Sequence, residues 1–303
     1  MTSGPARIRV GHVTLAATGV TCIVLPPGSV ASGEVRGGAP ASRELALLEP
    51  LRTVQHVDAI VFTGGSAFGL AAADGAMQVL ADAGRGYPTA GGPVPIVPTL
   101  ALFDLADGVT RPGAAEGAAA TRAALAAPER AFEHGRIGAG AGASIGKWKG
   151  RGHAVPGGLG VAHARLGDHG PELVALAVVN AVGDVIDDDG ALLAGSTAPA
   201  DAPDFPTDEP FRDGEHTTLV AVVTDAALDK VSAALLAQHA HDGFARALRP
   251  AHTRFDGDAV IAAATGAHEG DVSLDRLLHR GALVAASAIR AAVAPGAAPN
   301  ALR

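Results

Sequence analysis

A threonine at the start of an apolar run is the residue of this sequence that suggests chemistry most directly. Thr217 opens the run Thr217 to Thr224, which follows a stretch, Gly183 to Gly214, that is rich in Asp, Pro, Gly, Ser and Thr. A threonine hydroxyl has too high a pKa to attack an amide unaided, but a threonine released as a chain N-terminus has its own α-amine, whose pKa of about 7.7–8.0 suits a general base. A strand that begins abruptly after an exposed linker therefore suggests a nucleophile freed by self-cleavage, although threonine is also ordinary in strands.

Two carboxylates could serve such a nucleophile. Asp256 and Asp258 stand in the sequence Phe255-Asp256-Gly257-Asp258, just before another apolar run. Neighbouring strands could bring this turn beside Thr217, where a carboxylate could orient the ammonium or hydroxyl proton or hold a substrate amine. An ordinary Asp-Gly turn is the competing interpretation.

An amide and a lysine offer two further functions. Asn180 lies within the apolar run Leu173 to Val182 and needs hydrogen-bond partners if it is buried, so it could be an oxyanion donor or a structural cross-strand residue. Lys147 lies in the glycine-rich segment Gly138 to Gly152, where a lysine could lower the pKa of a nearby hydroxyl and backbone amides could line a ligand. A loop without a ligand is the alternative for this segment.

Ser66 is the rival nucleophile. It lies in Gly64-Gly65-Ser66-Ala67-Phe68-Gly69, at a predicted turn from a strand into a helix, where a nucleophile elbow places its serine. An elbow needs glycine two residues after the serine, and this chain has Phe68 there. A helix N-cap, or a loop of backbone donors that faces a ligand, is the simpler interpretation of Ser66.

Charge and motif searches exclude several other classes of protein. The 303 residues include 23 Lys and Arg against 31 Asp and Glu, and the net charge of −8 argues against nucleic acid or an anionic membrane surface as partner. The residues around Gly146-Lys147 do not form a phosphate-binding loop, no complete dinucleotide fingerprint is present, and the 12 histidines never form His-Glu-x-x-His. We therefore expect no metal site.

The cysteine content and the apolar segments predict a cytoplasmic protein. Cys22 is the only cysteine, so no intrachain disulfide can form, which is typical of a reducing compartment. The N-terminal residues 1–10 have no apolar core of signal-peptide length. Prolines interrupt the uncharged stretch Gly86 to Phe103, so it is not expected to span a membrane.

Apolar periodicity predicts a mixture of strands and helices, in an α/β or α+β arrangement. The predicted strands are Arg7 to Val13, Cys22 to Leu25, Ala59 to Thr63, Val94 to Val97, Val155 to Ala162, Leu173 to Val182, Thr217 to Thr224 and Ala259 to Ala264. The predicted helices are Ser66 to Ala83, Glu116 to Ala126, a helix capped by Asp225 that ends by Pro250 with Leu228, Val231 and Leu235 on one face, and Ser273 to Val293. Gly183 to Gly214 shows no periodicity and predicts an exposed linker.

Taken together, these residues resemble the L-aminopeptidase/D-esterase family of N-terminal-nucleophile-type hydrolases, which also contains β-aminopeptidases and nylon-oligomer hydrolases. The resemblance covers nearly the whole chain and rests on eight blocks in order. They are Gly11-His12, Val35-Arg36-Gly37-Gly38-Ala39-Pro40 with Arg43-Glu44, Thr63 to Leu70, Val94 to Pro98 with Phe103-Asp104-Leu105, Gly146 to Gly150, Val179 to Gly183, Thr217-Thr218-Leu219, and Phe255 to Asp258.

The resemblance implies an α+β fold, an αββα sandwich, in a single domain spanning residues 1–303. It implies an inactive precursor that cuts itself between His216 and Thr217 into an α chain, residues 1–216, and a β chain, residues 217–303. It further implies homotetramers or larger assemblies and no metal or organic cofactor. The substrates would be peptides, amides or esters.

The resemblance also assigns roles to the candidate residues. Thr217 would be the nucleophile and its amine the base, Asn180 the oxyanion donor, Lys147 a positioning or activating cation, and Asp256 with Asp258 the partners of the nucleophile. The candidates for the substrate-binding region are Gly65, Ser66, Phe68, Phe103 and Trp148.

Two other functions remain open from the sequence. A serine hydrolase that uses Ser66 would be active as an intact chain. A non-catalytic protein that binds small molecules would keep the bond between His216 and Thr217 intact.

Overall fold

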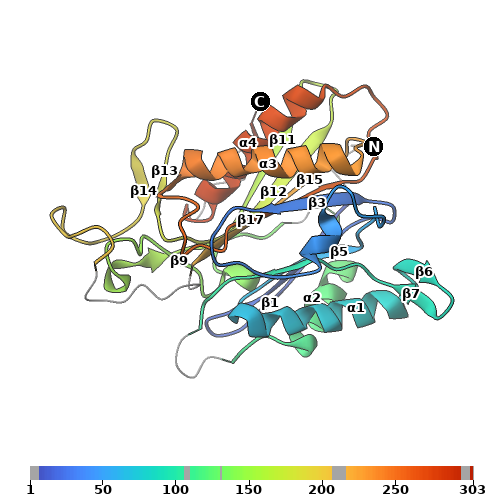
Figure 1. Cartoon of the computed structure of the whole chain (residues 1–303), viewed down its shortest axis with the longest axis horizontal. Coiled ribbons are helices and arrows are strands. Elements are labelled where there is room, and N and C mark those ends of the chain that lie inside the picture. Colours follow the sequence, from blue (N-terminus) through green and yellow to red (C-terminus); the bar gives the residue numbers. More distant parts are fainter. Residues whose placement is uncertain (1–6, 106–109, 130–131, 207–215, 295–300, 303) are drawn as a thin grey trace.

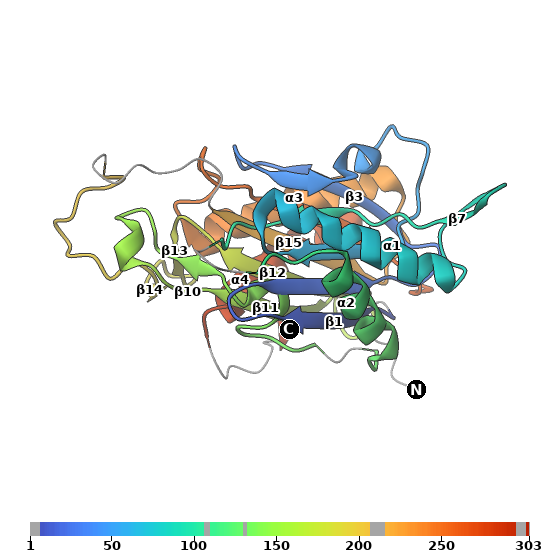
Figure 2. The same cartoon turned by 90° about the horizontal axis from the view of Figure 1, so that it is seen from below.

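Two β-sheets packed face to face, with a pair of helices on each outer side, make up the fold (Figure 1). The computed structural model describes residues 7–105, 110–129, 132–206, 216–294 and 301–302. The view from below shows the same layers, with the first pair of helices in front of the sheets (Figure 2). The four layers confirm the predicted αββα sandwich.

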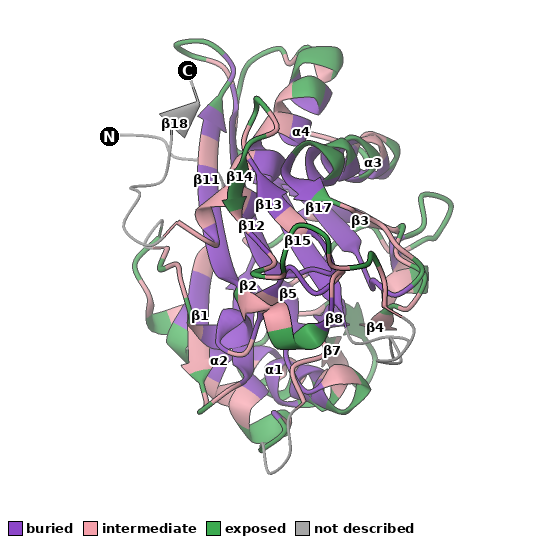
Figure 3. Ribbon diagram, turned by 90° about the vertical axis from the view of Figure 1, so that its left-hand side faces the viewer, coloured by how far each residue is buried: buried purple, intermediate pink, exposed green. Residues whose placement is uncertain are grey.

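The six-stranded sheet has the order β18-β11-β12-β15-β17-β3. Its strands are β3 (Val30–Val35), β11 (Gly158–Arg165), β12 (Glu172–Asn180), β15 (Thr217–Thr224), β17 (Ala259–Ala264) and β18 (Ala301–Leu302). β12 and β15 are buried along their whole length, because helices cover one face and the other sheet covers the second (Figure 3). Burial on both faces explains why these strands are continuous apolar runs in the sequence.

The five-stranded sheet has the order β1-β2-β5-β8-β4. Its strands are β1 (Arg9–Thr14), β2 (Gly19–Val24), β4 (Ala41–Arg43), β5 (Ala59–Thr63) and β8 (Thr99–Ala101). Side chains of both sheets, among them Ile23, Phe62, Leu176 and Ile261, fill one apolar cluster between the layers. This central cluster fixes how the two sheets sit against each other.

Four helices close the sandwich. α1 (Ala72–Asp82) and α2 (Ala114–Ala126) cover the five-stranded sheet, and α3 (Lys230–Ala247) and α4 (Leu274–Ala291) cover the six-stranded sheet. Each pair packs with its sheet around a separate apolar cluster. No helix in the described ranges combines the length and the apolar character that crossing a membrane requires.

Short elements connect these layers. The 3-10 segments are η1 (Leu45–Leu48), η2 (Ser66–Ala71), η3 (Gly138–Gly140) and η4 (Arg151–His153). The short strands are β6 (Tyr87–Thr89), β7 (Gly92–Val94), β9 (Ser144–Ile145), β10 (Val155–Pro156), β13 (Asp184–Ile186), β14 (Leu192–Ala194) and β16 (Leu248–Arg249). β9 and the loop after it carry Lys147 toward the end of β12.

The prediction that Gly183 to Gly214 is a linker without regular structure is partly wrong. In its described part, residues 183–206, β13 pairs with both β14 and β16. Asp187 Oδ1 accepts the backbone N–H groups of Asp189 and Ala191, at 3.0 Å and 2.7 Å, and so closes the turn between β13 and β14. An acidic side chain that caps a turn has the same composition as a solvated linker, so periodicity did not detect this hairpin.

Several predicted boundaries also differ from the structure, and two of them have a clear physical reason. Of the predicted strand Val94 to Val97 only Val94 lies in a strand, at the end of β7, because the N–H groups of Ile96 and Val97 donate to the side chains of Asp58 and Glu44. β8 begins only at Thr99. The third helix begins at Lys230, where Asp229 Oδ1 accepts the Ser232 N–H at 2.7 Å.

Asp225 and Val231, two residues of the predicted third helix, also differ from the prediction. Asp225 instead accepts the N–H of Glu172 at 2.8 Å, across the sheet edge. Val231, predicted on one face with Leu228 and Leu235, is 53% exposed, while those two leucines pack against the core.

Candidate active site

The start of β15 is where the predicted nucleophile meets two other segments of the chain. Antiparallel pairing sets Asn180, the last residue of β12, directly opposite Thr217, the first residue of β15. β17 runs parallel to β15, so the turn before β17 lies at the same edge of the sheet, and His216 pairs there with Asp256 in an isolated bridge. Strand direction and register therefore bring together residues that are far apart in the sequence.

The peptide bond between His216 and Thr217 is buried and polarised. The Thr217 hydroxyl donates to the carbonyl oxygen of His216 at 2.5 Å, and the backbone N–H of Gly257 donates to the same oxygen at 2.7 Å. Both residues of this bond are at most 2% exposed. The Gly257 N–H favours a negative charge on this oxygen, as a donor of an oxyanion hole does.

Lys147 and Asn180 form a buried pair next to this bond. The Lys147 ammonium donates to Asn180 Oδ1 at 2.9 Å and to the Asn180 backbone oxygen at 3.1 Å. Asn180 Oδ1 also accepts the N–H of Ser144 at 3.0 Å, while Asn180 Nδ2 donates to the Phe103 carbonyl at 2.8 Å. The amide is thus held in one orientation by contacts with three other residues.

Both carboxylates of the turn before β17 are hydrogen-bonded from several sides. Asp256 Oδ1 accepts the Val182 N–H at 3.2 Å, and its Oδ2 accepts the N–H and the hydroxyl of Thr253 at 2.9 Å and 2.6 Å. Asp258 Oδ1 accepts the N–H of Thr218, the residue after the nucleophile, at 2.7 Å. The two carboxylates therefore fix backbone segments that surround Thr217.

Burial and neighbouring charges shift two ionisable groups in this region. Burial, followed by the negative charge of Asp258, raises the pKa of Asp256 to about 7, so this carboxyl exchanges a proton near neutral pH. Burial, followed by the positive charges of Lys147 and Arg151, lowers the pKa of His216 to about 2. The imidazole of His216 is therefore neutral at physiological pH.

A pocket of about 180 Å³ opens beside the Lys147 ammonium. The residues that line it are Phe103, Asp104, Leu105, Gly142, Ser144, Lys147, Arg151 and Ala154. Asp104 has its pKa raised chiefly by burial, and its Oδ1 accepts the Gly65 N–H at 2.7 Å. A pocket of this size accommodates one small side chain or a short acyl segment beside Lys147.

The residues predicted to bind substrate divide into two groups. Phe103 lines the pocket, and Gly65 contacts it through Asp104. Ser66 donates its backbone N–H to the Leu102 carbonyl at 2.9 Å and does not line the pocket.

The two other aromatic candidates lie elsewhere. Phe68 is 60% exposed and lies under the Arg111 guanidinium, 3.9 Å from the ring centre. The Trp148 indole N–H donates to Asp184 Oδ2 at 2.9 Å, which ties this loop to β13.

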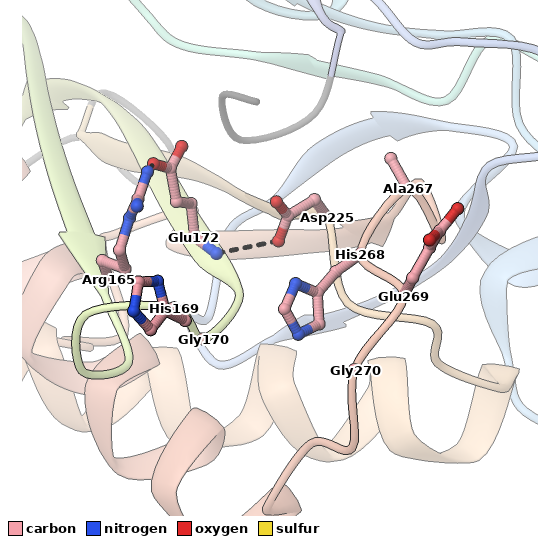
Figure 4. A pocket seen from close by; sticks show the side chains of 9 residues that line it. All are labelled: Arg165, His169, Gly170, Glu172, Asp225, Ala267, His268, Glu269 and Gly270. Atoms are coloured by element: carbon pink, nitrogen blue, oxygen red, sulfur yellow. Dashed lines mark hydrogen bonds and ion pairs between the residues drawn. The ribbon is translucent and has the colours of Figure 1, made fainter. Parts of the chain in front are cut away.

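A wider pocket, of about 470 Å³, lies at the opposite end of the same strands. Figure 4 shows Glu172 and Asp225 side by side there, with the Glu172 N–H bonded to Asp225 Oδ1. Glu172 is the first residue of β12 and Asn180 is the last, so this pocket is separated from Thr217 by about 25 Å of strand. Its lining includes no hydroxyl or thiol side chain.

Three residues of the site were not predicted from the sequence. Gly257 stands inside the predicted Phe255 to Asp258 motif, and no pattern in the sequence marks Thr253 or Arg151. Gly257 acts through its backbone N–H and its lack of a side chain, and neither property gives a pattern in a single sequence. No group of three or more His, Cys, Asp or Glu side chains in the described ranges is arranged to hold a metal ion.

Comparison of the chain with solved structures supports the fold. A Burkholderia sp. β-aminopeptidase superposes with a TM-score of 0.68 at 22% identity, covering 96% of this chain and 88% of its own. The L-aminopeptidase D-Ala-esterase/amidase of Ochrobactrum anthropi, described as a new variant of the Ntn hydrolase fold, gives a TM-score of 0.65 at 18% identity, covering 96% and 83%. At these identities the likeness shows the shared fold.

Sequence relatives and a family model identify the chain. An uncharacterized aminopeptidase of Mycobacterium leprae is 41% identical over 277 residues, which are 86% of this chain and 74% of the relative. A 6-aminohexanoate-oligomer endohydrolase of Agromyces sp. is 30% identical over 273 residues, which are 85% of this chain and 72% of the relative. The model of peptidase family S58 matches residues 6–300. The chain therefore belongs to peptidase family S58.

Proposed function

We propose that this protein is a self-processing hydrolase of small peptides, amides or esters that uses Thr217 as its nucleophile. As a member of a peptidase family, the chain is a hydrolase of peptide or amide bonds. The observation that carries the finer proposal is the hydroxyl of Thr217, which lies 2.5 Å from the carbonyl oxygen of the peptide bond before it. That oxygen also accepts the Gly257 N–H, so nucleophile and carbonyl lie together in a polarised, buried site.

Self-cleavage follows from this arrangement. Thr217 Oγ attacks the carbonyl carbon of His216, and the Gly257 N–H stabilises the negative charge on the oxygen. The bond from carbon to the Thr217 nitrogen breaks, that nitrogen takes the hydroxyl proton, and an ester links His216 to Thr217 Oγ. Water then hydrolyses the ester and gives an α chain, residues 1–216, and a β chain that begins with the free amine of Thr217.

The mature enzyme repeats this chemistry on a substrate. The α-amine of Thr217 takes the hydroxyl proton, Oγ attacks the substrate carbonyl, and the leaving amine or alcohol departs with a proton from the ammonium. Water hydrolyses the acyl-enzyme. Asn180, which Lys147 holds through two hydrogen bonds, and the N–H of Gly257 are the donors we assign to the oxyanion.

The pocket and the relatives support the proposed substrate class. About 180 Å³ beside Lys147 suits one small residue rather than a folded protein chain. The relatives include proteins named as an uncharacterized aminopeptidase and as a 6-aminohexanoate-oligomer endohydrolase. A homotetramer or larger assembly, and a cytoplasmic location, belong to the same proposal.

Intact mass and N-terminal sequencing of the purified protein test the proposal. The wild-type chain should give two products, of 216 and 87 residues, and the smaller should begin Thr-Thr-Leu. Thr217→Ala should remain one chain and hydrolyse no peptide or amide, while Thr217→Ser should keep part of both reactions. Thr89→Ala, a matched change in the exposed β6 strand, should cleave like the wild type.

The same experiment separates the two alternatives. Hydrolysis by an uncut chain that Ser66→Ala removes and Thr217→Ala leaves intact would establish a serine hydrolase instead. An uncut chain that binds small molecules and turns none over would establish a binding protein.

A further inference from the structure

His252, in the loop before β17, contacts Asp258 of the candidate site. His252 Nδ1 lies 2.9 Å from Asp258 Oδ2, and the His252 backbone N–H donates to the same oxygen at 3.1 Å. The other oxygen of Asp258 accepts the Thr218 N–H at 2.7 Å. The Asp258 carboxylate therefore connects His252 to the peptide unit that directly follows Thr217.

The ring of His252 is held by α3. Its centroid lies 5.0 Å from that of Phe244 and 4.9 Å from that of His241. The backbone of His252 has φ of 54°, in the left-handed region that few residues other than glycine adopt. The histidine is thus fixed both by its loop and by the helix that packs on the sheet.

The contacts also define which ring nitrogen carries the proton. His252 Nδ1 faces a carboxylate oxygen, which can only accept, so Nδ1 is the donor. His252 Nε2 is buried and has no hydrogen-bond partner among the described residues, as expected for a nitrogen without a proton. A ring with hydrogen on Nδ1 satisfies both observations.

We propose that His252 is a positioning residue for Thr217. Its Nδ1–H holds the Asp258 carboxylate, the carboxylate holds the Thr218 N–H, and the fixed peptide aims Thr217 Oγ at its target carbonyl. This proposal rests on the proposed function and adds a residue on the α3 side of the sheet to the site.

Burial explains why the ring is needed. Asp258 is 1% exposed, and a buried carboxylate requires donors at each oxygen. Its other donors in the described residues are the backbone N–H groups of Thr218 and His252, so the imidazole is the one side-chain donor that the structure shows there. Without the ring, Oδ2 keeps a single donor and the carboxylate can rotate away from Thr218.

Two substitutions at this position separate hydrogen bonding from backbone strain. Asparagine places an N–H donor at the same number of bonds from Cβ as Nδ1, and both asparagine and glycine tolerate a positive φ. His252→Gly should lower the rate of self-cleavage and the kcat for an amide substrate about 10- to 100-fold, the loss expected for one hydrogen bond to a charged group. KM should change little, and His252→Asn should stay within about threefold of the wild type in both rates.

One control variant and two possible results complete this test. His163→Asn removes a half-buried histidine of β11 that stacks on Phe132 and should leave both rates unchanged. Rates of His252→Gly equal to the wild type, or rates of His252→Asn as low as those of His252→Gly, would overturn the positioning role. Thermal unfolding of each variant shows that the compared chains are folded.

A spectroscopic measurement tests this inference independently of activity. Nitrogen-15 spectra of the uncut Thr217→Ala chain should show the His252 ring with hydrogen on Nδ1, and a ring with hydrogen on Nε2 alone would overturn the inference. Absence of cleavage in the wild type would contradict the proposed function instead, and the spectra would still decide the state of His252.

Discussion

Gly257 is the residue whose missing side chain matters most to the candidate site. A Cβ at this position would lie 2.7 Å from Thr217 Oγ1, inside van der Waals contact. Gly257→Ala should therefore displace the hydroxyl from the carbonyl oxygen of His216 and slow self-cleavage by at least about 100-fold, the loss typical of one oxyanion donor or a displaced nucleophile. A time course of intact mass measures the effect.

Gly152→Ala is the matched control for that substitution. A Cβ at Gly152 would have no neighbouring atom within 4 Å, so this position has room for a methyl group. Cleavage of Gly152→Ala at the wild-type rate, together with slow cleavage of Gly257→Ala, supports the steric explanation. Equal rates in all three chains would show that Thr217 does not act from the observed position.

Acid should destabilise the uncut chain through His216. The pKa of this imidazole is about 2 when folded, against 6.5 for an ordinary histidine, so the unfolded chain binds more protons between these values. The free energy of unfolding therefore falls as the pH falls below 6.5. In the Thr217→Ala background, His216→Asn should reduce this slope by up to about 1.4 kcal/mol per pH unit.

Urea unfolding of the two uncut chains at several pH values between about 4 and 7 measures this slope. Asp256 acts in the opposite direction, because a carboxyl whose pKa is raised to about 7 makes the folded state bind the extra proton. Asp256 is present in both chains, so the difference between their slopes isolates His216. Parallel curves would contradict the assignment.

At the scale of single residues, the sequence predicted the groups whose chemistry is distinctive. Thr217, Asn180, Lys147 and the two aspartates were predicted, and the structure brings them to one edge of the sheet. His252 was not predicted, because a histidine near a turn resembles any other histidine of the chain and its contact with Asp258 depends on tertiary packing. Their individual roles remain predictions.

At the scale of elements, strands that are buried on both faces were the easiest to predict. Ala59–Thr63, Thr217–Thr224 and Ala259–Ala264 have the predicted bounds, since an apolar run with turn residues on both sides has few other structures. β13 and β14 were missed because they are three residues each and depend on β16 from a distant part of the chain. Short strands of this kind are fixed by partners rather than by periodicity.

Replacing a glycine by alanine usually stabilises a helix, but at Gly117 of α2 the close contact with α1 should reverse this effect. A Cβ at Gly117 would overlap the backbone oxygen of Ala72 on the other helix. Gly117→Ala should therefore lower the free energy of unfolding by about 1–3 kcal/mol, as overpacking does, instead of raising it by up to about 1 kcal/mol through helix propensity.

Gly281→Ala in α4 is the comparison for this effect. Its added Cβ would meet the end of the Leu236 side chain, which can rotate, rather than backbone. Urea unfolding of uncut chains should show a smaller loss for Gly281→Ala than for Gly117→Ala. A stabilised Gly117→Ala chain would show that the two helices can separate at little cost.

At the scale of the whole molecule, the two products of cleavage should stay together. β15 would belong to the smaller chain, yet it lies between β12 of the larger chain and β17, with eight residues paired to β12. Separation would expose the apolar cores on both faces of the sheet. Native size-exclusion chromatography after cleavage should give one peak that contains both chains, and only denaturant should divide it.

The arrangement of layers was predictable only through the resemblance to a family. Periodicity alone left α/β and α+β arrangements open, because it does not reveal which strands are neighbours. The eight sequence blocks supplied that information, and the family match and the superposed structures confirm it.

The Gly257 N–H has a consequence for the timing of activity under the proposed function. In the uncut chain this donor is occupied by the carbonyl oxygen of His216, which holds the place that a substrate oxygen would need. Substrate turnover must then begin after a lag, and the lag must equal the lifetime of the uncut chain. Because attacking and attacked groups belong to neighbouring residues, that lifetime does not depend on protein concentration, and no other protease is required to end it.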